Sequence, residues 1–255
     1  MSRLFRIAID GPAASGKSTT AKRLAQKLGF GYIDSGAMYR AGTTPLKVTL
    51  KCLEQGVNPH DPTTKDTVSA VASKACIRFP ALGQVEMDGR DVSESIRTSD
   101  IVRHINPVAS NPAVRETLAE QQRAMAQGKV DGGSWPGFSW RQAERVQGVV
   151  MDGRDIGTVI LPDAELKVFI VADPLVRAQR RFAELKHKDT TESIQDIARD
   201  LAARDEADRT RLTSPLKKAE DAEELDTSQC TIDEQVKRIE TMVHDRIDQF
   251  LSLKV

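Results

Sequence analysis

The stretch G-P-A-A-S-G-K-S at residues 11–18 follows an apolar run and precedes a helical pattern. It matches G-x-x-x-x-G-K-[ST], in which glycines let the backbone turn tightly and point its N–H groups at a phosphate. Lys17 can then reach the β- and γ-phosphates, and the Ser18 hydroxyl can ligate Mg²⁺. The positive end of the following helix faces the same anion. We therefore expect a nucleoside triphosphate to bind here, at Gly11, Pro12, Ala13, Ala14, Ser15, Gly16, Lys17, Ser18 and Thr19.

Apolar runs alternate with helical patterns around this loop. The runs fall at 4–9, 30–33, 146–151 and 166–172. A helix is expected at 21–28, ending at Gly29, so that strand, helix and strand form a βαβ unit. Such units build parallel sheets, whose ligands lie beyond the carboxyl ends of the strands. The runs end on charged or hydroxyl side chains, namely Asp10, Asp34, Ser35, Asp152, Asp155 and Asp173. Ser35 is expected to cap a helix after the second run.

The sequence pattern divides the chain into a core and an inserted lobe. We expect the core at 1–41 and 112–255, with a small α+β lobe at 42–111. Within the lobe, 64–75 is typical of a helix, and 76–79 with 84–87 is typical of a hairpin about Gly83. A second D-G-R-D, at 88–91, closes this hairpin and is expected to be a turn.

The expected core carries three further features after the lobe. Residues 182–203 join two arginine-bearing helices through a polar stretch and are expected to be a lid. Residues 131–148 are expected to be an extra loop, since Trp135 and Trp140 lie there among turn-forming residues. A weakly apolar strand near 221–226 and a well-patterned helix at 232–250 complete the core.

Composition excludes several classes of protein. The chain has 255 residues, with 37 basic and 37 acidic side chains. This zero net charge predicts no attraction to nucleic acid or to an anionic membrane. The cysteines, Cys52, Cys76 and Cys230, fit neither a disulfide framework nor a zinc site. No apolar run has membrane-spanning length, and the first strand leaves no room for a signal peptide. We expect a cytoplasmic monomer.

Arginines distinguish among the proteins that share a phosphate loop. The guanine motif of GTPases, N-K-x-D, is absent, as is the apolar strand ending in D-E of motor and AAA-type ATPases. Arginines instead recur at structural points: Arg40, Arg154, Arg177, Arg181, Arg204 and Arg211. They could form solvated helix faces with carboxylates, or they could grip phosphate oxygens bidentately. We expect Arg177 and Arg181, which share a helix face, to contact phosphate from the lid.

A second anion would explain this density of positive charge. The acceptor phosphate of a monophosphate is already ionised at neutral pH, so that its attack requires no general base. Catalysis then consists of alignment and electrostatic stabilisation. For these tasks we select Lys17, Arg40, Arg154 and Arg204.

The motifs together resemble those of bacterial cytidylate kinases. In order, and over nearly the whole chain, they are G-P-A-A-S-G-K-S-T, I-D-S-G-A-M-Y-R, D-V-S-E-S-I-R, N-P-A-V-R, V-V-M-D-G-R-D-I-G-T and R-D-x-x-D-R-x-R. The resemblance implies an α/β fold, that of a parallel-sheet P-loop nucleoside monophosphate kinase with an inserted small lobe and a helical lid. It implies transfer of the γ-phosphoryl group of ATP, taken with Mg²⁺, to CMP or dCMP.

The resemblance also implies residue roles. The acceptor phosphate would be held by Ser35, Arg40 and Arg154. The cytosine edge would face Arg115 and Asp155, with Arg211 in support. Between them, Arg204 and Asp208 would contact the ribose and the closing lid. The implied CMP-binding set is Ser35, Arg40, Asn106, Arg115, Arg154, Asp155, Asp208 and Arg211.

Three features of the sequence leave questions open. Asn106 stands where the family commonly has a serine near the base, and the loop with the tryptophans is longer than the usual connection. Asp152 could hold Mg²⁺ with Ser18, or it could cap the next turn. Alternative functions are a kinase for another acceptor, such as UMP or a nucleoside, and a nucleotide-dependent switch.

Overall fold

The computed structural model describes residues 4–42, 66, 76–97, 109, 111–129, 146–186 and 192–252. Within these ranges, no helix is long and apolar enough to cross a lipid bilayer. Several predictions fall outside them: Asn106, nearly all of the helix at 64–75, residues 131–145 of the extra loop, and residues 187–191 of the lid.

The core is built on a five-stranded sheet in which every neighbouring pair is parallel. Its order is β2 (Gly31–Asp34), β6 (Gly148–Gly153), β1 (Phe5–Asp10), β7 (Leu166–Val171) and β8 (Glu223–Asp226). The register aligns the strand ends: Asp10 lies opposite Gly153, and Asp34 lies opposite Asp152. All the expected strands are confirmed, including the weakly apolar β8.

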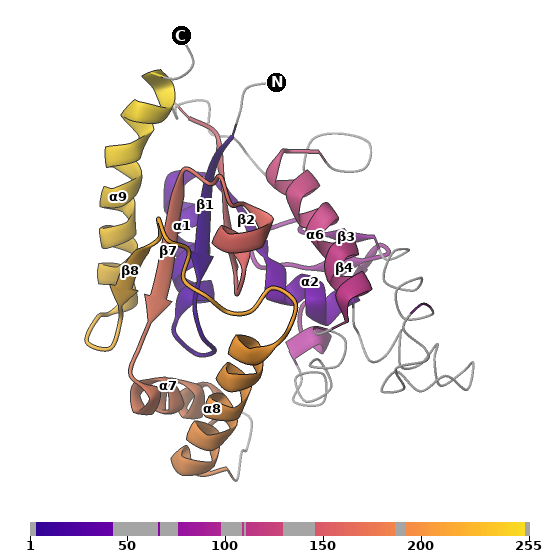
Figure 1. Cartoon of the computed structure of the whole chain (residues 1–255), viewed down its shortest axis with the longest axis vertical. Coiled ribbons are helices and arrows are strands. Elements are labelled where there is room, and N and C mark those ends of the chain that lie inside the picture. Colours follow the sequence, from indigo (N-terminus) through magenta and orange to yellow (C-terminus); the bar gives the residue numbers. More distant parts are fainter. Residues whose placement is uncertain are drawn as a thin grey trace.

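Helices cover both faces of the sheet because its strands are apolar on both. Phe5, Ile7 and Ile9 of β1 pack in one cluster with α1 (Lys17–Leu28) and α9 (Ile232–Ser252). Ala8 packs in the opposite cluster, with α2 (Ser35–Gly42) and α6 (Pro112–Ala126). Figure 1 shows α9 on one side of the sheet and α6 on the other. This alternation is that of a doubly covered parallel sheet, as expected.

Helices α7 (Pro174–Lys186) and α8 (Ile194–Thr210) pack on each other beyond the carboxyl ends of the strands (Figure 1). Ser193 and Asp196 form a capping box that begins α8. Ala178, Ile197 and Leu201 join Ala13 of the phosphate loop in a third apolar cluster. The two helices on either side of the predicted lid connection are thus packed against the loop.

The described part of the predicted lobe is a small antiparallel sheet of β3 (Ile77–Arg78), β4 (Glu86–Met87) and β5 (Arg90–Asp91). The hairpin about Gly83 is confirmed. The turn expected at 88–91 is right for Asp88 and Gly89, which have positive φ, and wrong for β5, which pairs with β4.

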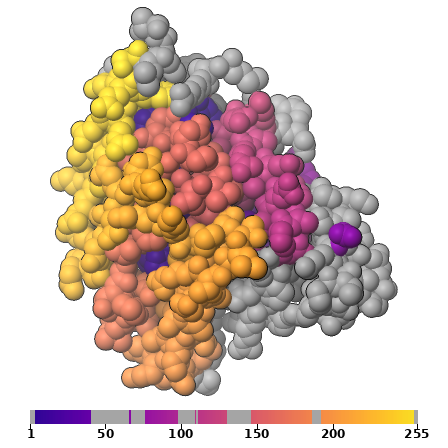
Figure 2. Space-filling view, in the orientation of Figure 1, coloured from indigo at the N-terminus to yellow at the C-terminus, as the bar shows by residue number. Residues whose placement is uncertain are grey.

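This hairpin packs against the core rather than around a centre of its own. Ile77, Phe79 and Val85 lie in the same apolar cluster as α2 and α6, with Ile96 of η3 (Ser95–Arg97). In the space-filling view, α8 and the orange residues after it lie beside the magenta α6 on one face (Figure 2). The lobe boundaries at 42 and 111 stay a prediction.

Candidate active site

The phosphate loop has the backbone geometry that its glycines permit. Gly11 approaches the Ile170 carbonyl of β7 so closely that a Cβ would collide with it, and Gly16 has φ +89°. Gly16 is the N-cap of α1 and offers no side-chain acceptor to the first turn of that helix. The N–H groups at this helix end therefore stay available to an anion.

Lys17 is buried at the first position of α1, and its Nζ donates to the Pro12 carbonyl at 3.1 Å. Burial, with the guanidinium groups of Arg154 and Arg204 nearby, lowers the pKa of Lys17 to about 7. A triphosphate would supply the negative charge that this site lacks.

Asp152 lies at the end of β6 with both carboxylate oxygens occupied. Ser18 Oγ donates to Oδ2 at 2.6 Å, and Tyr32 Oη donates to Oδ1 at 2.8 Å. Burial, with the carboxylate of Asp34 nearby, raises the pKa of Asp152 to about 6. An adjacent hydroxyl and carboxylate fit Mg²⁺, which takes one or two protein oxygens and completes its shell with phosphate and water. The described residues contain no cluster of three or more His, Cys, Asp or Glu that could hold a metal without such help.

The turn that follows β6 is capped by the carboxylate of Asp10. It accepts from the backbone N–H groups of Ile156 and Gly157 at 2.9 and 2.7 Å, at the start of the π-helix η4 (Ile156–Ile160). The capping alternative for Asp152 is therefore wrong. Burial, opposed by these two bonds, raises the pKa of Asp10 to about 7. Asp10 thereby joins the start of the phosphate loop to the turn that carries Asp155.

The start of α2 differs from expectation in its cap. Asp34 caps the helix, accepting from Ala37 N at 2.7 Å, whereas Ser35 Oγ donates to the Asp152 carbonyl at 2.7 Å. Asp34 also pairs with Arg40, with 3.1 Å between Nη2 and Oδ2, and lies 4.0 Å from the guanidinium of Arg97. These contacts hold Arg40 in the part of the site where the acceptor phosphate is expected, which we call the acceptor end.

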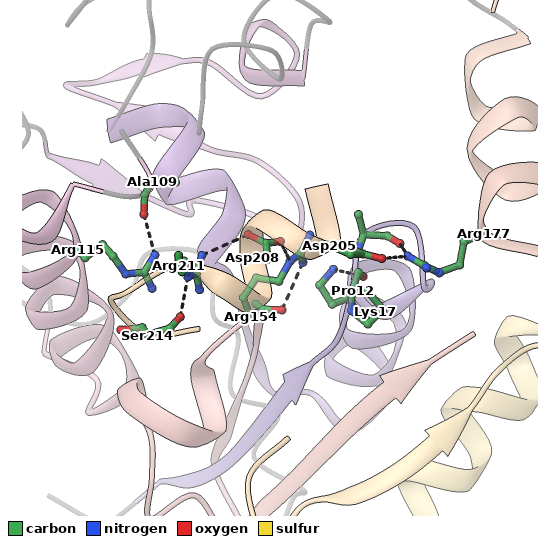
Figure 3. Close-up of polar contacts among 12 residues, drawn as sticks. Pro12, Lys17, Ala109, Arg115, Arg154, Arg177, Asp205, Asp208, Arg211 and Ser214 are labelled. Carbon is green, nitrogen blue, oxygen red and sulfur yellow. Dashed lines mark hydrogen bonds and ion pairs between the residues drawn. The ribbon is translucent and has the colours of Figure 1, made fainter. Parts of the chain in front are cut away.

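Arginine–carboxylate pairs line the remainder of the acceptor end. Arg115 and Asp155 form a pair with side chains only 4% and 5% exposed. Arg154 Nε donates to Asp208 at 2.7 Å, and Arg211 contacts the other oxygen of Asp208 at 3.4 Å. Figure 3 shows Arg115, Arg211, Asp208 and Arg154 in a row that leads towards Lys17 and Pro12 of the phosphate loop.

Charge in this row is only partly balanced. Burial would raise the pKa of Asp208, but Arg154 and Arg211 outweigh it and lower that pKa. Burial, with Arg154 nearby, lowers the pKa of Arg204 to about 10, so Arg204 stays charged at neutral pH. The site therefore holds cations that no carboxylate fully neutralises.

Several buried polar atoms at the acceptor end have no hydrogen-bond partner among the described residues. They are Tyr39 Oη, Arg40 Nε, Arg115 Nε and Arg211 Nη2. The Arg115 guanidinium lies 5.1 Å from the centre of the Tyr39 ring, which is a cation–π distance. Burial raises the pKa of Tyr39 to about 12, so its hydroxyl is a neutral donor. Because buried polar groups are normally paired, these atoms mark where a polar ligand fits.

One cavity, of about 810 Å³, joins this acceptor end to the phosphate loop. Its volume is that of a small-molecule site. More basic than acidic side chains line it; the basic ones are Lys17, Lys22, Arg23, Arg40, Arg97, Arg115, Arg154, Arg181, Arg204 and Arg211. The arrangement fits two anionic ligands end to end.

A sequence model of the family described as cytidylate kinase matches residues 7–132 and 139–245. The chain belongs to this family. It is 45% identical to a cytidylate kinase of Chloroherpeton thalassium over 95% of this chain and 94% of that protein. It is 40% identical to one of Anoxybacillus flavithermus over 97% of this chain and all of that protein. Residues 133–138, between the two matched ranges, fall inside the predicted extra loop.

The cavity of this cytidylate kinase family member brings together most of the residues selected from sequence. From the loop it contains residues 13–19, and from the acceptor set it contains Ser35, Arg40, Arg115, Arg154, Asp155, Asp208 and Arg211. Arg181, Arg204 and Asp152 also line it. Gly11 and Pro12, at the start of the loop, do not line the cavity.

Arg177 differs from expectation. Its side chain is 6% exposed and pairs with Asp205 beneath the loop, and it does not line the cavity. The structure therefore does not support phosphate contact by Arg177, because burial on the far side of Ala13 separates it from the ligand space.

Sequence reasoning placed Asp10 and Asp34 at the ligand edge of the sheet without giving either a role, and it missed Tyr32, Tyr39 and Arg97. The signals for Asp34, Tyr39 and Arg97 were present, since all three lie inside the matched motifs I-D-S-G-A-M-Y-R and D-V-S-E-S-I-R. Asp10 had a weaker signal, as a carboxylate directly before the loop. Tyr32 had none, because an aromatic residue in an apolar strand is typical of a core position.

Proposed function

We propose that this chain transfers the γ-phosphoryl group of ATP to CMP or dCMP, giving the corresponding diphosphate. One observation carries the proposal: the buried Arg115–Asp155 pair opens into the same cavity as the phosphate loop. Cytosine presents an amino donor at position 4 and an acceptor at N3. A carboxylate can accept from the first, and a guanidinium can donate to the second.

The unpartnered polar atoms support the same acceptor end. Arg115 keeps a free Nε, and its Nη1 is fixed by the Ala109 carbonyl at 2.9 Å. Tyr39 supplies a neutral hydroxyl nearby. These groups would pair with the edge of a base, which removes the cost of leaving them unsatisfied.

Phosphoryl transfer requires little more than alignment and charge from this chain. The acceptor phosphate is ionised at neutral pH, because its second pKa is about 6. Asp208 orients Arg154 through Nε, and Arg154 lines the cavity. Lys17, Arg40 and Arg204 would add positive charge around the transferring group, where charge spreads in the transition state.

Ser18 and Asp152 are the residues that would hold Mg²⁺, which when bound neutralises charge on the β- and γ-phosphates. Tyr32 fixes the carboxylate from the other side by its bond to Oδ1. We further propose that the enzyme acts as a monomer on small nucleotides.

A switch that hydrolyses ATP without an acceptor is the alternative of another class. The arginine-lined acceptor end favours transfer, since hydrolysis needs no second anion site. Incubation with ATP, Mg²⁺ and either CMP, dCMP, cytidine or no acceptor tests this, with products followed by ³¹P NMR. We expect diphosphate signals for CMP and dCMP only. Equal ADP release without any acceptor would contradict the proposal.

A further inference from the structure

Beneath the phosphate loop, a buried ion pair grips the backbone of one loop residue from both sides. Asp205 Oδ1 accepts from the Ala13 N–H at 3.3 Å. Arg177 Nη1 donates to the Ala13 carbonyl at 3.1 Å and to Asp205 Oδ2 at 2.5 Å. The three residues therefore form a closed set of hydrogen bonds, which we call the Ala13 clamp. Figure 3 shows Arg177 and Asp205 pointing towards each other.

The clamp is enclosed. The side chains of Arg177 and Asp205 are 6% and 2% exposed, and Ala13 is 5% exposed. Charge-assisted hydrogen bonds are strong where water is excluded, and they fix geometry as well as contribute energy. The apolar cluster of Ala13, Ala178 and Leu201 closes around them.

The two charges come from the helices on either side of the predicted lid. Arg177 lies in the first turn of α7, and Asp205 lies in α8 next to Arg204. Consecutive residues of α8 thus face two ways: Arg204 lines the cavity and Asp205 holds the loop from behind. Asp208, one turn further, orients Arg154.

Ala13 precedes the most constrained part of the loop. Ala14 has φ +56°, a left-handed conformation that costs free energy for a residue with a Cβ. Fixing both backbone polar groups of Ala13 holds the peptides that lead into this conformation. The N–H groups that follow are those that face a phosphate.

We propose that Arg177 and Asp205 are positioning residues that tie the conformation of the phosphate loop to the placement of α7 and α8. Neither touches substrate. They act through Ala13, so that the loop binds the triphosphate well only when α8 holds Arg204 and Asp208 at the cavity. The inference deepens the proposed function, on which it rests only for the identity of the acceptor.

The first test compares Asp205→Asn with Asp200→Asn, an exposed position of the same helix that serves as a matched control. Calorimetry measures the Kd of a non-hydrolysable ATP analogue with Mg²⁺, and separately the Kd of CMP. We expect Asp205→Asn to weaken the analogue about tenfold, the loss of one charge-assisted hydrogen bond, with CMP within about twofold. A lower melting temperature with both Kd values unchanged would overturn the proposal, because the pair would then be structural only.

A second variant removes both charges, since one unpaired buried charge can unfold the protein. Arg177→Met with Asp205→Leu should stay folded, because apolar replacement of a buried pair is often neutral for stability. Its loop should still bind the analogue about tenfold more weakly. The single variant Arg177→Lys keeps a charged donor and should therefore bind the analogue more tightly than the double variant does. A folded double variant with wild-type affinity would overturn the proposal.

Hydrogen exchange of the wild-type protein needs no variant. Without ligand, the Ala13 amide should exchange more slowly than the amides of Ser15 and Gly16, because Asp205 holds it. Exchange of Ala13 as fast as these two would contradict the clamp. The analogue titration involves no acceptor, so a failure to phosphorylate CMP would sink the proposed function and leave the clamp result intact.

Discussion

The phosphate loop offers its ligand backbone N–H groups and one lysine, whereas the acceptor end offers side chains that are already paired with carboxylates. Burial, with the guanidinium groups of Arg154 and Arg204 nearby, lowers the pKa of Lys17 to about 7. Arg40, Arg115 and Arg154 instead each contact an aspartate. Lys17 is thus held by burial without a carboxylate in direct contact among the described residues, whereas these three arginines each have one.

This difference indicates how each end of the site selects its ligand. A loop of backbone N–H groups recognises the phosphates that all nucleoside triphosphates share. Paired side chains recognise a pattern of donors and acceptors, because a ligand must match groups whose positions are already fixed. Specificity should therefore reside at the acceptor end and charge stabilisation at the loop.

The loop lysine should show the largest effect. Lys17→Ala removes charge from the transferring group, and we expect kcat to fall by about 10²- to 10³-fold or more. The variant should stay folded, since among the described residues the Lys17 side chain donates only to the Pro12 carbonyl. Lys27→Ala, on the exposed side of α1, is the control. Near-normal turnover of Lys17→Ala would remove the loop from the mechanism.

Asp155→Ala should affect selectivity rather than the loop. We expect the ratio of kcat/KM for CMP to that for UMP to fall at least about tenfold, with the KM for ATP nearly unchanged. Removing one partner of a buried pair also costs stability, about 3–5 kcal/mol. The measurement is therefore made below the melting temperature of the variant, beside Asp155→Asn. An unchanged ratio would show that this pair does not read the base.

The charge state of the loop makes a pH prediction. Lys17 in the free enzyme is mostly neutral at pH 8, because its pKa is lowered to about 7. Bound triphosphate raises that pKa, so binding at pH 8 should take up about one proton. Calorimetry in buffers of different ionisation enthalpy measures this uptake, which Lys17→Met should abolish. Identical heats in all buffers would contradict it.

The lowered pKa of Lys17 also affects the stability of the free enzyme. Between pH 7 and the usual lysine pKa of 10.5, the unfolded chain binds more protons at Lys17 than the folded chain does. The contribution of Lys17 to the free energy of unfolding therefore rises with pH across this window. Chemical unfolding of wild type and Lys17→Met at pH 7 and pH 9 measures the difference.

The smallest effect is expected for the predicted extra loop. Deletion of residues 132–140 should leave kcat/KM within about twofold, because turn-rich insertions tolerate removal. The family match omits 133–138, in agreement with this expectation. A large loss of turnover with stability preserved would bring this segment into the active site.

Sequence predicted the loop end of the molecule better than the acceptor end. The P-loop motif dictates backbone geometry, so Gly16, Lys17 and Ser18 could be placed from spacing alone. The parallel sheet followed from the alternation of apolar runs and helical patterns. At the acceptor end, Arg115 and Asp155 are far apart in sequence, and only the family resemblance brought them together.

Which arginine faces the ligand could not be predicted from helical spacing. Arg177 and Arg181 share a face of α7, yet Arg181 lines the cavity and Arg177 is buried against Asp205. The difference arises from packing of α7 against α8 and the loop, which helical periodicity does not report. For a similar reason α2 is capped by Asp34 and not by Ser35. The Ser35 Oγ donates instead to the Asp152 carbonyl of β6.

The wild-type preference for CMP over UMP tests the central claim most directly. Initial rates of ADP release at saturating ATP and Mg²⁺ give kcat/KM for each acceptor. Uracil would place a carbonyl against Asp155 and an N–H against Arg115, leaving buried polar groups mismatched. We predict a ratio in favour of CMP of at least about a hundredfold. Equal efficiency with the two monophosphates would contradict the assignment of base recognition to the acceptor end.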